Sequence, residues 1–120
     1  MKTVVVLGAT PKTDRYAWKA MQMLKEYGHR RIPVNPAFPE VDGERCFASI
    51  GDVGEPVDTV TLYLSAARSE PLISEIIQAK PRRIIMNPGA ESDLLAEEAR
   101  ANRIEVVEGC TLVMLRAGTF

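Results

Sequence analysis

Residues 4–15 read Val4-Val5-Val6-Leu7-Gly8-Ala9-Thr10-Pro11-Lys12-Thr13-Asp14-Arg15, and the class of fold can be inferred from them. Its first four residues are apolar without alternation and three of them are β-branched, which is typical of a parallel strand covered by helices on both faces. Gly8 breaks this pattern. From Arg15 onwards apolar residues recur at helical spacing, and Gly28 is a suitable helix stop. The stretch therefore predicts a central strand, a loop and a helix.

The same order of strand, loop and helix continues along the chain. Further strands are predicted at residues 31–34, 57–64, 83–86 and 104–107, and further helices at residues 69–80 and 91–101. Scattered glycines and prolines make residues 35–56 an irregular connection. Alternating strands and helices imply right-handed crossovers and a parallel sheet. We therefore expect one domain, residues 1–120, of the α/β class: a Rossmann-like doubly wound parallel sheet of five to six strands in three αβα layers.

The composition excludes several classes of function. The chain has 15 basic and 16 acidic residues and a net charge of -1, which gives no broad positive field for binding nucleic acid or an anionic membrane. Cys46 and Cys110 stand far apart and His29 is the only histidine, so no zinc site is expected. The apolar run at residues 4–7 is too short for a signal peptide or a membrane span. We expect a cytoplasmic protein.

Ligands of open α/β sheets bind outside the carboxyl ends of the strands, where the strand order reverses. This rule selects the loop at residues 8–15, which leads directly into a helix whose N-terminus attracts anions. Gly8 and Ala9 keep the turn free of bulk, Thr10 offers a hydroxyl group, and Lys12 and Arg15 offer positive charge for a pyrophosphate. The alternative is a tight turn with solvated charges.

The loop lacks the fingerprint of dinucleotide-binding folds, because threonines stand at positions 10 and 13, where GxGxxG needs glycines. The second strand ends at Asn35-Pro36, where NAD-binding folds usually have an acidic residue for the ribose hydroxyls. A neutral Asn35 does not repel a ribose that carries a phosphate. Coenzyme A and NADP, with their 3′- and 2′-phosphates, both remain candidate ligands.

In the order and spacing of its segments the chain resembles the small coenzyme A-binding domain proteins, which are similar to the nucleotide-binding domain of the succinyl-CoA synthetase α subunit. The resemblance spans nearly the whole chain. It rests on residues 5–12, Arg15, Trp18, Ile32-Pro33-Val34-Asn35-Pro36, residues 55–60, Asn87-Pro88-Gly89-Ala90-Glu91 and Cys110. In the fourth loop Met86-Asn87-Pro88 replaces the tryptophan and glutamine that are usual in the family.

The resemblance implies a ligand path along the edge of the sheet. The pyrophosphate is expected near Gly8 to Lys12 and Arg15, the adenosine near Asn35 and Pro36, and the pantetheine arm past Ser65 to Arg68 and past Asn87, Pro88 and Gly89. Trp18, beside the phosphate loop, is either a stacking residue or part of the core. The synthetases also have a second domain with a phosphorylated histidine, which is not expected here, so acyl-CoA ligase chemistry is not carried over.

Other residues that could carry chemistry have simpler interpretations. Cys110 precedes a possible last helix and could form a mixed disulfide with coenzyme A, but a packing cysteine is expected. His29 and the basic residues Arg30, Arg31, Arg82 and Arg83 open strands on the opposite edge and are expected to face solvent. No Ser/His/Asp arrangement and no paired catalytic carboxylates stand on the ligand-side loops.

The sequence thus favours non-catalytic binding of coenzyme A or an acyl-CoA through the Gly-Ala-Thr-Pro-Lys loop. Two other hypotheses stay open. One is an NADP-linked oxidoreductase domain, which 120 residues have little room to build. The other is a scaffold without nucleotide affinity, whose apolar residues 111–115 dock on a second copy, giving a homodimer, or on a partner.

Overall fold

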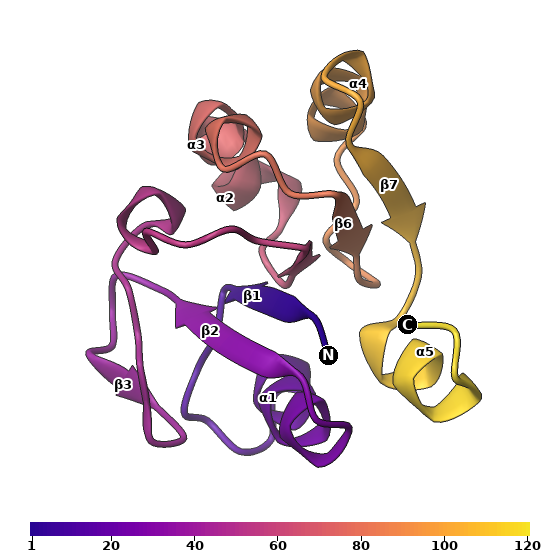
Figure 1. Cartoon of the computed structure of the whole chain (residues 1–120). Coiled ribbons are helices and arrows are strands. Elements are labelled where there is room, and N and C mark those ends of the chain that lie inside the picture. The colour runs from indigo at the N-terminus through magenta and orange to yellow at the C-terminus, as the bar shows by residue number, and fades with distance from the viewer.

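A five-stranded parallel sheet forms the centre of the structure, a computed structural model that describes residues 1–120 (Figure 1). The strands are β1 (Thr3–Leu7), β2 (Arg30–Val34), β5 (Thr59–Leu62), β6 (Arg83–Met86) and β7 (Glu105–Glu108). Their spatial order is β2-β1-β5-β6-β7, and all neighbours are parallel. The chain moves outward from β1 to β2 on one side and from β5 to β7 on the other. The strand order therefore reverses between β1 and β5.

Helices cover both faces of this sheet. Figure 1 shows α1 (Tyr16–Glu26) and α5 (Thr111–Ala117) below the sheet, and α2 (Ala66–Ser69), α3 (Ile73–Gln78) and α4 (Asp93–Ala101) above it. The expected Rossmann-like αβα fold is confirmed, with five strands in the main sheet. No helix is long and apolar enough to cross a membrane.

The central strand explains why the fold has two hydrophobic layers. Val4 and Val6 pack into the cluster shared with α1 and α5, whereas Val5 and Leu7 pack into the cluster shared with α3 and α4. All four side chains are buried. Successive residues of a strand point to opposite faces, so a strand between two helical layers needs apolar residues at every position.

The connection after β2 folds back beside that strand. It contains a hairpin of β3 (Glu40–Val41) and β4 (Glu44–Arg45) and a 3-10 turn at Ile50–Asp52. The Asn35 amide donates to the Phe47 carbonyl at 2.9 Å, and the Phe47 amide donates to the Pro33 carbonyl at 3.0 Å. These bonds bring residues 47–50 to the end of β2, a placement that local sequence patterns do not predict.

The expected helix at residues 69–80 is divided in the structure. Helix α2 starts earlier, a 3-10 turn occupies Glu70–Leu72, and α3 follows. Pro71 lies in that turn and has no N–H to donate to the preceding turn, so a regular helix cannot run through it. The division leaves a short α2 directly above the end of β5.

Two basic residues at strand starts differ from the sequence expectation of a solvated face. Arg31 and Arg83 are only 6% and 8% exposed. The Arg31 guanidinium pairs with the Asp42 carboxylate of the hairpin. The Arg83 Nε atom donates to the Thr59 hydroxyl at 3.1 Å, and its guanidinium lies 4.6 Å from the centre of the Phe120 ring. The prediction was wrong here because distant segments cover both side chains.

Candidate ligand site at the switch point of the sheet

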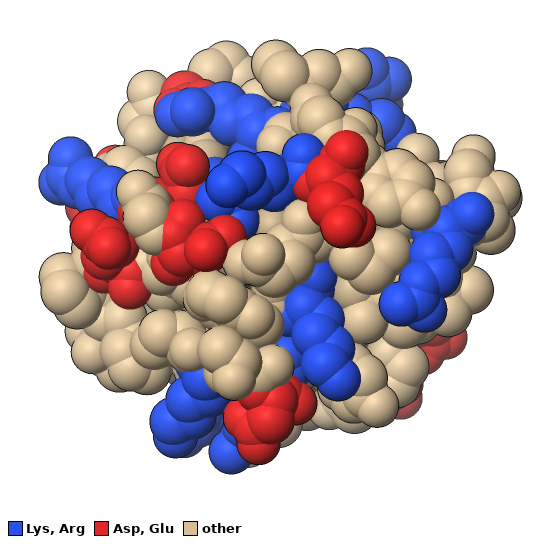
Figure 2. Space-filling view, turned by 90° about the horizontal axis from the view of Figure 1, so that it is seen from below, with Lys and Arg blue, Asp and Glu red and all other residues tan.

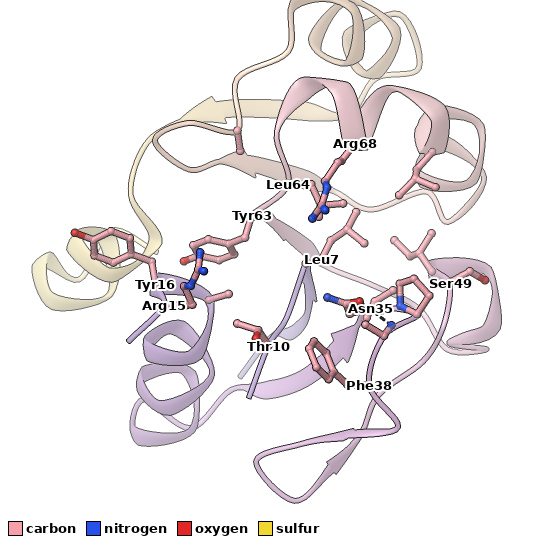
Figure 3. A pocket seen from close by; sticks show the side chains of 18 of the residues that line it. Leu7, Thr10, Arg15, Tyr16, Asn35, Phe38, Ser49, Tyr63, Leu64 and Arg68 are labelled. Atoms are coloured by element: carbon pink, nitrogen blue, oxygen red, sulfur yellow. Dashed lines mark hydrogen bonds between the residues drawn. The ribbon is translucent and has the colours of Figure 1, made fainter. Parts of the chain in front are cut away.

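A cleft of about 1050 Å³ opens over the carboxyl ends of the strands. Its lining includes residues that directly follow three of the strands, Gly8 after β1, Asn35 after β2 and Tyr63 after β5, and Pro88, which stands two residues after β6. Figure 3 shows Asn35 and Tyr63 in this lining. The cleft therefore straddles the point where the strand order reverses, which is where open α/β sheets bind ligands. A cleft of this volume can hold a large small-molecule ligand.

Nine of the thirteen residues expected at the ligand line this cleft. They are Gly8, Thr10, Lys12, Arg15, Asn35, Pro36, Arg68, Pro88 and Gly89. Four do not line it: Ala9, Trp18, Ser65 and Asn87. Ala9, within the loop after β1, is fully buried. Trp18 packs against the core cluster that α1 shares, so the interpretation of Trp18 as a core residue fits its position.

The turn after β1 depends on a glycine. Gly8 has a φ of 95°, in the left-handed region, and an added Cβ would lie 3.0 Å from the Leu64 side chain and 3.2 Å from the Tyr63 carbonyl carbon. Its amide donates to the Val34 carbonyl at 3.0 Å. Because glycine alone adopts this backbone without cost, the chain can pass close to β5 and enter the cleft.

The first turn of α1 is open to an anion. Its N-cap residue Arg15 makes no side-chain capping bond, and the turn contains no acidic residue. In contrast, Ser92 caps α4 by accepting a 3.1 Å hydrogen bond from the Leu95 amide, and Asp93 lies in that first turn. The free N–H groups and the helix dipole at α1 favour a negative ligand group.

The charges around the cleft are mostly positive. Lys12, Arg15 and Arg68 are exposed and line it, and Glu75 is its only acidic residue. The only ion pair among the three cations is an exposed contact of 3.9 Å between Arg15 and Asp14, which contributes little stability. Elsewhere the two signs are mixed, as Figure 2 shows for the face that carries α1 and α5.

Asn35 holds the loops of the cleft together. Its Nδ2 donates to the Ala9 carbonyl at 2.9 Å, and its Oδ1 accepts from the Ala37 amide at 2.9 Å. The side chain thus joins the loop after β1 to the loop after β2. Within the protein, the Asn35 amide thus positions the loop after β1.

Tyr63 lines the cleft, but its hydroxyl group is buried. This hydroxyl is the only buried polar side-chain atom without a hydrogen-bond partner. Burial raises the pKa of Tyr63 to about 12, against the smaller opposing effect of the nearby Thr61 and Thr111 hydroxyls. The side chain therefore stays neutral, and the residue lines the cleft (Figure 3).

Asn87 lies beneath the cleft in a closed polar network and is only 2% exposed. Its Nδ2 donates to the Thr61 hydroxyl at 2.8 Å and to the Leu62 carbonyl at 3.0 Å, and its Oδ1 accepts from the Thr111 amide at 2.8 Å. The Thr61 and Thr111 hydroxyls are 2.8 Å apart. Asn87 thus anchors the start of α5 to β5 and β6, while Pro88 and Gly89 face the cleft.

Sequence reasoning missed several residues that line the cleft. Tyr16, Phe38, Ser49, Leu72 and Glu75 belong to this group. Tyr16 follows the loop after β1 and could have been found from its position, but the others come from the connection after β2 and from the segment around α3. Only the folding of those segments against the sheet brings them to the cleft. No group of three or more His, Cys, Asp or Glu residues is placed to hold a metal ion.

The fold and the cleft define an open α/β domain with a ligand-sized site at its switch point. The sequence model of one protein family, described as CoA binding domain, matches residues 2–116. The chain belongs to this family, and the resemblance seen in its motifs is confirmed.

Comparisons with individual proteins agree with this assignment. The crystal structure of an uncharacterized protein, 48% identical, superimposes with a TM-score of 0.95 and covers 100% of this chain and 98% of that chain. The uncharacterized protein YneT of Bacillus subtilis is 30% identical over 71 residues, 59% of this chain and 50% of YneT. The ADP-forming acetate–CoA ligase of Methanocaldococcus jannaschii is 28% identical over 63 residues, which are 52% of this chain and 9% of the ligase. The matches thus span half or less of these two curated relatives.

Proposed function

We propose that this chain is a binding module for coenzyme A or an acyl-CoA and that it carries out no reaction itself. The pyrophosphate lies at the loop after β1 and the first turn of α1, held by backbone N–H groups, Lys12 and Arg15. The nucleoside end lies toward Asn35 and Pro36. The pantetheine arm leaves along the loops after β5 and β6, past Arg68 and Gly89.

The observation that carries this proposal is the uncapped N-terminus of α1 inside a cleft with three cations. Helix α1 lacks both a side-chain cap and an acidic residue in its first turn. Lys12, Arg15 and Arg68 line the same cleft without a strong ion pair. Phosphate oxygens accept hydrogen bonds from such groups, and membership in the CoA binding domain family supports coenzyme A as the ligand.

A catalytic role has no support in the residues of the cleft. The chain's single histidine, His29, lies at the opposite edge of the sheet, where its Nδ1 accepts from the Lys2 amide at 3.1 Å. Glu75 is the only carboxylate that lines the cleft. No acid and base are therefore placed together for proton transfer to a bound ligand.

The experiment is a calorimetric and thermal-shift comparison of coenzyme A, 3′-dephospho-coenzyme A, NADP and NAD on the wild type and on Lys12→Ala/Arg15→Ala. Coenzyme A should bind best, and the double variant should bind it at least about 100-fold more weakly, because each of the two lost charged hydrogen bonds contributes about 1.5–3 kcal/mol. A matched control, Lys25→Ala/Arg100→Ala, removes the same charge outside this cleft and should bind like the wild type.

The other outcomes select the other hypotheses. Preference for NADP over coenzyme A would contradict the proposal and favour an oxidoreductase domain. Absence of binding for all four ligands would favour the scaffold. Equal weakening in both double variants would show that net charge, and not the loop after β1, attracts the ligand.

A further inference from the structure

The cleft differs chemically between its two ends. Figure 3 shows Arg15 and Tyr16 at one end, Asn35 and Ser49 at the other, and Arg68 extending into the cleft between them. Arg15 and its neighbour Lys12 make the first end positive. The second end, at Asn35, is where the proposed function places the nucleoside part of the ligand.

The only carboxylate of the cleft belongs to the second end. Glu75 lies on α3, which packs against the 3-10 turn at Ile50–Asp52, next to Ser49. Its side chain is half-buried and takes part in none of the salt bridges or side-chain hydrogen bonds of the structure. A carboxylate only accepts hydrogen bonds, so Glu75 offers two free acceptor atoms to a ligand.

Apolar side chains surround this end of the cleft. Pro36, Phe38, Ile50 and Leu72 line it, and Phe38 lies beside Asn35 in Figure 3. Such surfaces suit the faces of a flat heterocyclic ring, whose polar edge then needs a hydrogen-bond partner. At this end of the cleft, the Glu75 side chain can accept a hydrogen bond from an amino group, because it makes no hydrogen bond or salt bridge within the protein.

We propose that Glu75 accepts a hydrogen bond from the exocyclic amino group of the ligand's purine, which makes the cleft selective for 6-aminopurines over 6-oxopurines. This inference rests on the proposed function, because it places the base at the end of the cleft opposite the pyrophosphate site. A 6-aminopurine presents an N–H donor at this position, whereas a 6-oxopurine presents an acceptor oxygen. Two facing acceptors repel each other and leave a charged group without a partner.

The test measures the affinity of coenzyme A and of its 6-oxopurine analogue, in which hypoxanthine replaces adenine. The wild type should prefer coenzyme A by at least about tenfold, the usual size of such base discrimination. Glu75→Gln should bind both ligands with similar affinity, because the glutamine amide can accept from the amino group or donate to the oxygen. The control variant Glu97→Gln removes an exposed carboxylate of α4 and should retain the wild-type preference.

The ratio of the two affinities separates recognition from a structural effect. Glu75 also lies in the first turn of α3, so Glu75→Gln can lower the stability of that helix. A loss of stability weakens the binding of both ligands to the same extent and leaves the ratio of the two affinities unchanged. An unchanged ratio in Glu75→Gln, or a wild-type ratio near one, overturns the inference while the proposed function stands. A wild type that binds neither ligand overturns both.

Discussion

The Asn35 side chain donates a 2.9 Å hydrogen bond to the Ala9 carbonyl and so connects two loops that are 26 residues apart. Together with the 3.0 Å bond from the Gly8 amide to the Val34 carbonyl, it fixes the loop after β1 against the end of β2. The phosphate site that we propose requires N–H groups that already point in the right direction. This contact orders the loop without a ligand.

Removal of this contact should weaken both folding and binding. Asn35→Ala loses the bonds to Ala9 and Ala37, and we expect the free energy of unfolding to fall by about 1–2 kcal/mol. Coenzyme A should bind more weakly because the phosphate loop loses its support. Urea unfolding and calorimetry measure the two effects.

Asn35→Asp tests which bond matters. It retains the acceptor for the Ala37 amide but cannot donate to the Ala9 carbonyl. If the bond to Ala9 orders the loop, both variants lose stability. An Asn35→Ala variant as stable as the wild type would show that the contact orders nothing.

Gly8→Ala should be more harmful than the same change at another glycine with positive φ. Gly8 combines a φ of 95° with a close approach to Leu64, whereas Gly28 has a φ of 79° and open space where a Cβ would stand. We expect Gly28→Ala to cost about 1 kcal/mol from backbone strain alone and Gly8→Ala about 2–4 kcal/mol, since overpacking is added. Chemical denaturation of both variants gives the comparison. Equal losses would mean that the packing against Leu64 is unimportant.

Tyr63→Phe should stabilise the protein. The Tyr63 hydroxyl is buried without a hydrogen-bond partner, so its removal relieves a desolvation cost of about 1 kcal/mol. The ring, which lines the cleft, is retained. Urea unfolding at neutral pH measures the gain, and a clear loss of stability would indicate that the hydroxyl has a partner in solution.

Tyr63→Phe also tests how Tyr63 makes the stability of the wild type depend on pH in the alkaline range. The folded pKa of Tyr63, about 12, lies above the ordinary value of about 10 in the unfolded chain. Between these values the unfolded state loses its proton first, so stability falls as pH rises. The wild type should lose about 2–3 kcal/mol more than Tyr63→Phe over this range. Parallel pH profiles of the two proteins would contradict the prediction.

The ion pair of Arg31 and Asp42 should support the hairpin until the pH becomes acidic. The hydrogen bond from Arg31 holds the pKa of the Asp42 carboxyl below its ordinary value. The ion pair therefore contributes fully to stability above the ordinary pKa, and the contribution is lost as the pH falls through the lower pKa of the folded state. Asp42→Asn should lower stability by about 1–3 kcal/mol at neutral pH, because the buried Arg31 loses its counter-charge.

A matched control is the exposed pair of Arg30 and Glu55, with N and O atoms 2.7 Å apart. Glu55→Gln should leave the free energy of unfolding nearly unchanged, because solvent screens this pair. The acid side of the stability profile should be flatter in Asp42→Asn than in the wild type. A profile identical to that of the wild type would show that Asp42 titrates in the same way in the folded and unfolded chain.

Local sequence patterns predicted the elements at the sheet well. The strand at residues 83–86 has the expected limits, and β1 extends the expected strand by one residue. These elements follow from the sequence pattern, since most strand residues that a helix layer covers are apolar or β-branched. Pro71 shows the weakness of the same approach, because the apolar stripe of residues 69–80 continues through a position where a regular helix cannot.

Residue patterns are enough to show that strands alternate with helices, that the carboxyl ends of the strands meet at one edge, and that a helix start with Lys12 and Arg15 lies there. The residues that face this loop, in contrast, depend on how distant segments pack. Phe38, Ser49 and Glu75 reach the cleft because the connection after β2 and helix α3 pack against the sheet, and Arg31 is buried because a hairpin covers it. The physical reason is that periodicity reports the local burial of each element, whereas the walls of a cleft are made by contacts between segments far apart in the chain.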